Sequence, residues 1–268
     1  MCGLAGLLRP TPDTDADRLS GLARVMGDAM LHRGPDDSGV WVEEQAGIAL
    51  AHRRLSILDL SPLGHQPMAS ADHRHVIAYN GEIYNFAELR EGLVARGHAF
   101  RGHSDTEVLL AAVVEWGIEE EIARCNGMFA IALWDRQERC LWLARDRVGK
   151  KPLYYGWAGD TFVFGSELKA LWQHPAFDNA VDPDALALLL RLDYIPAPHA
   201  IHVDTFKLMP GSLLRVDAQD VARGAQAHVP ERDQRRYWDA RERMDAAIAQ
   251  PFTVDVLVAV YHMVALVR

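Results

Sequence analysis

Short apolar runs alternate with polar turns along residues 3–216 of this 268-residue chain. Runs of about 4–8 apolar or alternating residues, bounded by turn residues, are typical of strands. The two runs at 39–42 and 47–51 are expected to form a hairpin, and the four runs between 128 and 164 an antiparallel meander. The pattern predicts strands at residues 3–8, 39–42, 47–51, 75–79, 128–134, 140–145, 153–157, 161–164 and 212–216.

Other segments have the apolar spacing and the end signals of helices. Ser104 or Asp105 is expected to cap a helix that ends near Gly117, and Gly97 is expected to end the helix before it. Antiparallel strands with a few helices are typical of the α+β class, in which helices cover the sheets. The remaining helices are predicted at residues 17–31, 86–96, 168–172 and 183–192.

The dipeptide Asn80-Gly81 follows the strand predicted at residues 75–79. Asn-Gly is the strongest two-residue signal for a hairpin, because both residues adopt positive φ angles readily. We therefore expect Asn80, Gly81 and Glu82 to form a turn.

The chain changes character after about residue 217. Residues 217–236 are polar and rich in Gln, Arg and Asp, which predicts a linker or a sheet edge. Residues 252–268 are strongly apolar, but this run is shorter than the roughly 20 residues that a membrane-spanning helix needs, and it contains Asp255 and His262. We therefore expect no membrane anchor, but a helix or strand whose packing partner is missing.

Charge and cysteine content exclude several classes of protein. The formal net charge of −9 argues against nucleic acid as a general partner. Three cysteines, Cys2, Cys125 and Cys140, are odd in number and widely spaced, so they predict neither a disulfide framework nor a metal site. The chain starts without the pattern of a signal peptide, and we expect a reducing, cytoplasmic environment.

Cys2 has the clearest potential for chemistry. Because cysteine is small, removal of Met1 is expected, and it leaves a thiol and a free α-amine on one residue. The thiol is the nucleophile, and an α-amine with a pKa of about 7.7–8.0 can accept its proton near neutral pH. Taken alone, Cys2 is also consistent with a cysteine that merely precedes a buried strand.

A series of short motifs follows Cys2 along the chain, and each alone is a common turn, strand end or cap. Together with Cys2 they resemble the class II glutamine amidotransferases, which are N-terminal-nucleophile hydrolases, and among them the glutaminase domain of asparagine synthetases. The segments 193–198 and 207–211 resemble that branch rather than the enzymes of amidophosphoribosyl or hexosamine synthesis. The motifs are His32-Arg33-Gly34-Pro35-Asp36, Arg53-Arg54-Leu55-Ser56-Ile57, Tyr79-Asn80-Gly81-Glu82-Ile83-Tyr84-Asn85, Ser104-Asp105, Gly127-Met128-Phe129-Ala130, Arg145-Asp146-Arg147-Val148-Gly149 and Ser166-Glu167-Leu168-Lys169-Ala170-Leu171.

The resemblance implies a four-layer α/β/β/α sandwich of two antiparallel sheets. It also implies that Cys2 attacks the side-chain amide of L-glutamine, while the Asn80 amide and the Gly81 N–H form an oxyanion hole. The α-amine of Cys2 would take the thiol proton and later hand it to ammonia.

The resemblance further implies which residues bind glutamine. Arg54 would hold the α-carboxylate, with Arg53 as the alternative, because a planar guanidinium suits a carboxylate. Asp105 would hold the α-ammonium, Glu82 would accept from the substrate amide, and the backbone near Leu55 and Ile57 would also contact the substrate.

The expected domains are residues 2–216, an amidotransferase domain, and 217–268, a linker with the incomplete start of a synthetase domain. A synthetase domain needs a Ser-Gly-Gly-x-Asp-Ser loop for ATP, and no glycine follows Gly224. We therefore expect a truncated chain without cofactor or metal in this portion, because ATP and Mg belong to the missing domain. The expected partners are L-glutamine, a synthetase domain or chain, and a second copy in a homodimer.

Two other functions remain open on the sequence. One is a folded but poorly active binding module that partners a separate synthetase chain, and the other is a glutaminase of another amidotransferase branch. The basic segment 147–152 is expected to be a solvated turn, with contact to a partner domain or to the glutamine-site loops as the alternative.

Overall fold

The computed structural model describes residues 1–11, 15–225, 228 and 230–249. They fall into two compact units, Met1–Tyr237 and Trp238–Arg268. The described part of the second unit contains helix α9 (Ala240–Ile248), which begins where the Asp239 side chain accepts from the backbone of Arg241. The apolar run predicted at 252–268 lies outside the described residues.

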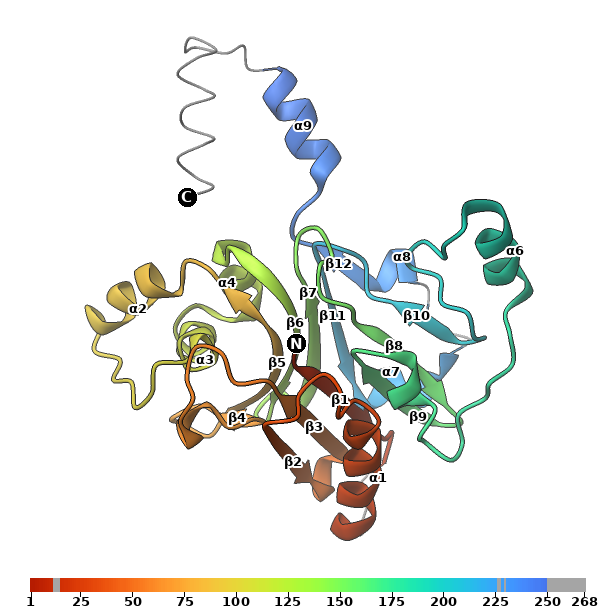
Figure 1. Cartoon of the computed structure of the whole chain (residues 1–268), viewed down its shortest axis with the longest axis horizontal. Coiled ribbons are helices and arrows are strands. Elements are labelled where there is room, and N and C mark those ends of the chain that lie inside the picture. Colours follow the sequence, from red (N-terminus) through yellow and green to blue (C-terminus); the bar gives the residue numbers. More distant parts are fainter. Residues whose placement is uncertain (12–14, 226–227, 229, 250–268) are drawn as a thin grey trace. The chain divides into compact units, whose positions relative to one another are not determined.

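The start of the chain lies in the interior of the first six-stranded antiparallel sheet, called sheet A here (Figure 1). β1 pairs with β3 on one side and with β9 on the other, so neither of its edges is free. Across the sheet the strands are β10 (Thr205–Lys207), β8 (Tyr154–Ala158), β9 (Thr161–Gly165), β1 (Gly3–Leu8), β3 (Ile48–Arg54) and β2 (Asp37–Glu43).

The second six-stranded sheet, sheet B, is also antiparallel and contains the longest strands. β5 and β6 pair along their whole length, from His75 opposite Asp135 to Ile83 opposite Gly127. Across this sheet the strands are β12 (Gln234–Arg236), β11 (Ser212–Asp217), β7 (Cys140–Arg145), β6 (Gly127–Asp135), β5 (His75–Ile83) and β4 (Met68–Ala69).

The two sheets pack face to face, and helices cover their outer faces. Between the sheets lies a buried core that includes Leu8, Trp134, Leu143 and Phe164. Sheet A is covered by α1 (Ala16–Asp28) and α5 (Leu168–Leu171), and sheet B by α3 (Asp105–Trp116) and α4 (Ile118–Arg124), with α2 (Phe86–Val94) packed on α3. The predicted α+β fold in four layers is confirmed.

Shorter elements complete the first unit. They are the 3₁₀ turns η1 (Glu44–Ala46) and η2 (Pro62–Gly64), and the helices α6 (Pro183–Leu192), α7 (Ala218–Arg223) and α8 (Pro230–Asp233).

The predicted strands and helices all occur, with ends that shift by a few residues, but two tertiary predictions were wrong. Asn80-Gly81 does not form a turn, because β5 continues through it and pairs Gly81 with Phe129 of β6. The four strands from 128 to 164 do not form one meander, because β6 and β7 lie in sheet B and β8 and β9 in sheet A. The local pattern predicts where strands occur. The sheet that a strand joins depends instead on pairing with strands distant in sequence.

The segment after residue 217 contains more structure than the sequence indicated. Asp217 and Asp220 form a capping box that begins α7, and β12 then adds an edge strand to sheet B. Of the two alternatives, linker or sheet edge, the edge is confirmed by β12. The assignment of residues 217–268 to an incomplete synthetase domain stays a prediction.

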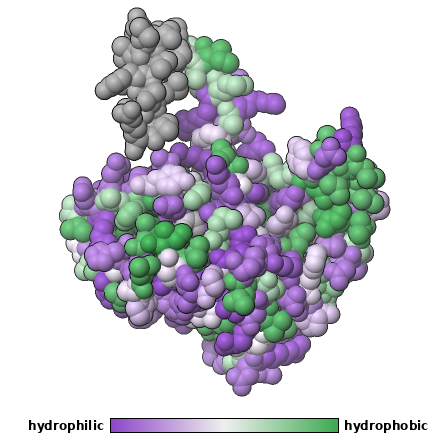
Figure 2. Space-filling view, in the orientation of Figure 1, coloured by the Kyte–Doolittle hydropathy of each residue, from purple (hydrophilic) through white to green (hydrophobic). Residues whose placement is uncertain are grey.

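The core between the sheets yields a matched test of stability. Leu143→Ala removes a fully buried side chain, and we expect it to lower the free energy of unfolding by about 2–5 kcal/mol, since a cavity remains. Leu190→Ala is the control, because Leu190 is 77% exposed on α6, where apolar side chains gather on the surface (Figure 2). Urea unfolding of both variants measures the difference, and equal losses would contradict this account of the core.

Candidate active site

A pocket of about 180 Å³ opens where the start of β1 and the end of β3 meet β5 of the other sheet. The structure brings all eight predicted site residues to this one pocket: Cys2, Arg54, Leu55, Ile57, Asn80, Gly81, Glu82 and Asp105. Residues that the sequence analysis did not place there also line it, namely Met1, Leu58, Asp59, Gly64, Gln66, Tyr79, Ser104, Thr106, Met128 and Lys151.

Cys2 is held on two sides at the start of β1. The Leu55 backbone N–H donates to the Cys2 sulfur at 3.3 Å, and the thiol lies 3.6 Å from the Leu55 carbonyl oxygen. The Arg33 Nε donates to the Cys2 carbonyl oxygen at 2.9 Å, while its Nη1 pairs with Glu167 at 2.8 Å. An N–H directed at sulfur favours negative charge there, so this arrangement suits a nucleophilic thiol.

The motif at residues 32–36 builds this end of the pocket. Gly34 packs so closely on the backbone of Arg53 that a Cβ would lie 2.3 Å from the Arg53 carbonyl carbon. Two residues later, the Asp36 carboxylate accepts from the Ser56 N–H at 2.8 Å. The backbone N–H of Asp36 donates to the Arg54 carbonyl oxygen. The motif therefore fixes both Cys2, through Arg33, and the chain that leaves β3.

Asn80 presents an unused hydrogen-bond donor. The residue is 1% exposed, and its side-chain Nδ2 has no partner among the described residues. At the neighbouring Gly81, a Cβ would lie 2.3 Å from the Met128 carbonyl oxygen, so only glycine fits beside β6. A buried amide donor without a partner costs stability, which favours a role with a bound ligand.

Of the two adjacent arginines, Arg54 lines the pocket. Its guanidinium donates to the backbone carbonyls of Asp59 and Ser61, at 3.0 Å for the latter, and five N–H donors leave further capacity for a ligand. Arg53 instead forms an ion pair with Asp28 of α1. Hydrogen bonds from the Ser61 side chain and from the His103 and Ser61 backbone lower the pKa of Asp59 to about 2, which keeps this loop charged.

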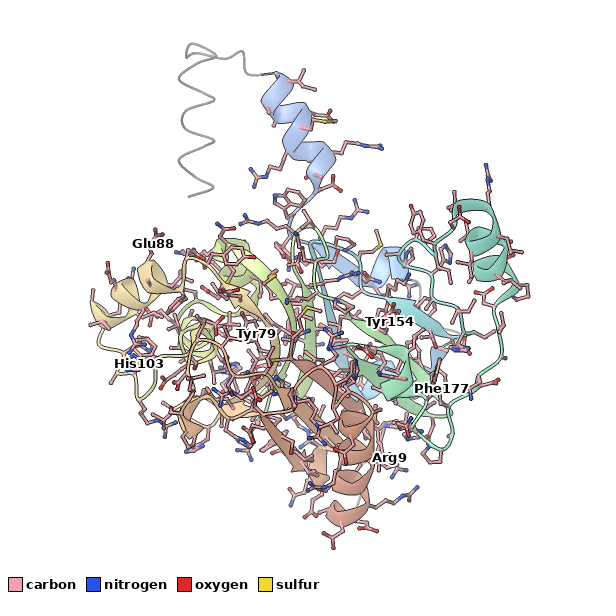
Figure 3. The ribbon with its side chains drawn as sticks, in the orientation of Figure 1. Arg9, Tyr79, Glu88, His103, Tyr154 and Phe177 are labelled. Atoms are coloured by element: carbon pink, nitrogen blue, oxygen red, sulfur yellow. The ribbon has the colours of Figure 1, made fainter. Side chains whose placement is uncertain are left out.

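Asp105 stands at the first turn of α3 and contacts Tyr79 of β5, which Figure 3 labels. Its carboxylate accepts from the Tyr79 hydroxyl at 2.7 Å and from the Ile83 N–H at 3.0 Å. Burial raises the pKa of Asp105, and these hydrogen bonds oppose that shift. Gln66 adds support, because its side-chain oxygen accepts from the Tyr79 N–H at 2.7 Å.

His52 links the two sheets directly behind the pocket. Its Nε2 lies 2.9 Å from the Tyr79 carbonyl oxygen, so it joins β3 to β5 one residue before Asn80. Burial lowers the pKa of His52 to about 4, with the Tyr79 carbonyl opposing the shift. The ring is therefore neutral at physiological pH and acts as a fixed hydrogen-bond donor.

Lys151 is the main site residue that the sequence analysis missed. The basic segment was expected to be a solvated turn, with contact to a partner domain or to the glutamine-site loops as the alternative. The first reading is right for the exposed Lys150, whereas Lys151 is 5% exposed in the pocket wall and fits the contact with the glutamine-site loops. The available signal was its position two residues after the Arg145–Gly149 motif. Gln66 and Asp59 carried no such signal, since they reach the pocket through loops.

Two absences apply to the part of the chain that the structure describes. No group of three or more His, Cys, Asp or Glu side chains is arranged to hold a metal ion. Within the same residues, no helix has the length and apolarity needed to cross a membrane.

A family model and curated relatives match most of this chain. Residues 1–238 match the family described as glutamine amidotransferase domain. The chain is 38% identical to asparagine synthetase [glutamine-hydrolyzing] 1 of Bacillus subtilis over 79% of its length, and 34% identical to a putative asparagine synthetase of Mycobacterium bovis over 97%. It spans only 33% and 43% of those two proteins.

A solved structure with the same fold is glutamine phosphoribosylpyrophosphate amidotransferase from B. subtilis, with a TM-score of 0.60 at 18% identity. The likeness covers 81% of this chain and 48% of that one, and at this identity it shows the fold alone.

The buried His52 predicts how stability depends on pH. Its folded pKa of about 4 lies below the ordinary 6.5, so the unfolded chain binds the extra proton between those values. We expect the free energy of unfolding to fall by up to about 3 kcal/mol as the pH drops from 6.5 to 4. His75 and His174 also have lowered pKa values, so the test is the difference between wild type and His52→Gln. Denaturant unfolding across this range should show a weaker pH dependence in His52→Gln, and parallel curves would refute it.

Proposed function

The chain belongs to the glutamine amidotransferase domain family, and from that premise we propose that the pocket beside Cys2 hydrolyses L-glutamine to L-glutamate and ammonia. One observation carries the proposal: the Cys2 thiol and the unpartnered amide donor of Asn80 face the same pocket. A nucleophile beside an unused hydrogen-bond donor is the arrangement that acyl transfer requires.

In the proposed reaction, removal of Met1 frees the α-amine of Cys2 as the base. The sulfur attacks the side-chain amide carbon of glutamine, the α-amine carries the thiol proton to the leaving nitrogen, and ammonia departs from a thioester. Water then attacks the thioester, which releases glutamate and restores the thiol. The Leu55 N–H, 3.3 Å from the sulfur, supports negative charge on it.

Asn80 and Gly81 would stabilise the oxygen that becomes negative in both steps. The Asn80 amide is already buried and fixed, so it would need little reorganisation when that charge develops. One donor of this kind typically lowers the barrier by about 3–4 kcal/mol. Asn is suited to this role because its amide donates without carrying a charge.

The two charged ends of free glutamine match two charged walls of the pocket. Arg54 would bind the α-carboxylate, and its guanidinium is already positioned by the carbonyls of Asp59 and Ser61. Asp105 would bind the α-ammonium, and the hydrogen bonds from Tyr79 and Ile83 orient its carboxylate. In this assignment Glu82 accepts from the substrate amide, and the backbone near Leu55 and Ile57 completes the contact.

The fate of the ammonia follows from the named relatives. We infer that it serves ATP-dependent amidation of aspartate or a similar carboxylate in a synthetase domain or chain, where ATP and Mg would bind. Exposed apolar side chains favour a protein partner: Ile57 is 67% and Leu60 79% exposed beside the pocket. The same observation supports the second candidate, a binding module with little activity of its own.

Cys2→Ala removes the nucleophile, so we expect glutamate release from glutamine to fall to background. Cys140→Ala is the matched control, because Cys140 is buried in β7 away from the pocket, and it should retain activity. Enzymatic assay of glutamate, with intact-mass measurement of the chain start, tests both. Unchanged release by Cys2→Ala, or full activity with Met1 still attached, would end this mechanism.

Asn80→Ala removes one oxyanion donor, and we expect kcat to fall about 100–1,000-fold with a small change in KM, because the donor acts mainly on the transition state. Asn126→Ala, at an exposed asparagine outside the pocket, should leave both constants unchanged. Steady-state kinetics with glutamine separates the outcomes. A rise in KM at constant kcat would instead assign Asn80 to substrate binding.

A further inference from the structure

Lys151 is a largely buried lysine in the wall of the pocket, and its ammonium group has no partner among the described residues. It is 5% exposed and shares the pocket with Cys2. Its backbone is fully engaged, yet its Nζ has no hydrogen bond or ion pair within the described part of the chain. Because the rest of the side chain is enclosed and the ammonium lines the pocket without a partner, an anion in the pocket is the natural group to pair with it.

The position of Lys151 is fixed by a turn built around the fully buried Asp146. Four backbone N–H groups donate to this one carboxylate, those of Phe129, Val148, Lys150 and Lys151, at 2.9–3.2 Å. A turn tied at so many points holds its last residue in one place. The Lys151 backbone therefore does not depend on its side chain for its position.

Arg145 ties the same turn from the other side. Its guanidinium donates to the carbonyl oxygens of Lys151 at 2.9 Å, Gly149 at 2.8 Å and Leu208 at 2.6 Å. Gly149 has a φ of +69°, which glycine adopts without strain. The Arg145–Gly149 motif thus positions Lys151 rather than acting on a ligand itself.

Lys151 and Cys2 line the same pocket, and charged groups of this region act on the lysine. Burial lowers the pKa of Lys151 and the Arg33 guanidinium adds to this, whereas negative charge on Cys2, Glu82 and Asp146 opposes it. The Nη2 of Arg33 is a second buried cationic donor without a partner among the described residues. Arg33 as a whole is paired with Glu167, so Lys151 is the cation of this region that is left without an ion pair among the described residues.

We propose that Lys151 makes the pocket wall beside Cys2 an anion subsite, which stabilises negative charge on the sulfur and takes a carboxylate at the reacting end. In a glutaminase that carboxylate is the one that replaces the amide when glutamine becomes glutamate, and this second part rests on the proposed function. An ammonium suits such a subsite because it is a compact point charge that accepts an anion from several directions.

Alkylation of Cys2 by two reagents of similar size but different charge tests the subsite without any turnover. Iodoacetate is an anion and iodoacetamide is neutral, and in both the sulfur displaces iodide. We expect Lys151→Met to lower the ratio of the iodoacetate rate to the iodoacetamide rate roughly fivefold, since one nearby positive charge is lost. Lys151→Arg should restore the ratio. Mass spectrometry locates the adduct, and Cys125 and Cys140 are buried.

Lys150→Met is the matched control, because it removes the same charge from an exposed neighbour on the same turn and should leave the ratio unchanged. An unchanged ratio in folded Lys151→Met would overturn the subsite. A second measurement uses wild type alone and does not depend on the folding of a variant. The ratio of its iodoacetate rate to its iodoacetamide rate should exceed the ratio for a peptide of residues 2–8. A ratio no higher than the peptide's would also overturn the proposal.

Inhibition by product separates this proposal from the proposed function. In Lys151→Met we expect the inhibition constant of L-glutamate to rise about fivefold more than the KM of L-glutamine. A shifted alkylation ratio without glutaminase activity in wild type would keep the anion subsite and remove the glutaminase. Glutaminase activity in wild type, with an alkylation ratio that Lys151→Met leaves unchanged, would keep the glutaminase and remove the anion subsite.

Discussion

The pairing of β1 on both of its edges is the constraint on which the rest of the site depends. Because β3 and β9 hold this strand, the residue before it cannot move far, and Cys2 is placed at the end of an interior strand rather than on a free terminus. The partner strand β3 ends at Arg54, beside Cys2, so one pair of strands delivers both the thiol and a cation. Arg33 and Leu55 then fix the two ends of the cysteine, its carbonyl and its sulfur.

The groups that share the pocket with the thiol come from β5 of the second sheet and from the connection between β7 and β8. Asn80 has a buried donor without a partner, which lowers stability unless a ligand is present, and Lys151 has an ammonium without a partner among the described residues. The surrounding structure offsets this cost with contacts that need no ligand, such as the His52 link between the sheets and the turn around Asp146. Both groups line the pocket, where a bound ligand would supply their partners.

The sequence predicted the strands, the layers and eight of the residues that line the pocket, because these depend on local pattern or on motifs met in order. It did not predict which sheet each strand joins, since β7 and β8 are neighbours in sequence but lie in different sheets. Asn80-Gly81 misled for a physical reason: the glycine serves close contact with the Met128 carbonyl in mid-strand, and not a positive φ. The sequence did not predict the burial of Lys151, because the burial of a lysine depends on the conformation of its turn. Here hydrogen bonds to Asp146 fix that turn, and only the structure shows them.

Met1 lies against the pocket, directly ahead of the paired strand. Because Met1 lines the pocket and β1 is paired on both of its edges, a peptide fused to Met1 would begin at the pocket. Affinity tags and fluorescent fusions for this protein therefore belong at the other end of the chain, or behind a protease site whose cleavage leaves cysteine as the first residue.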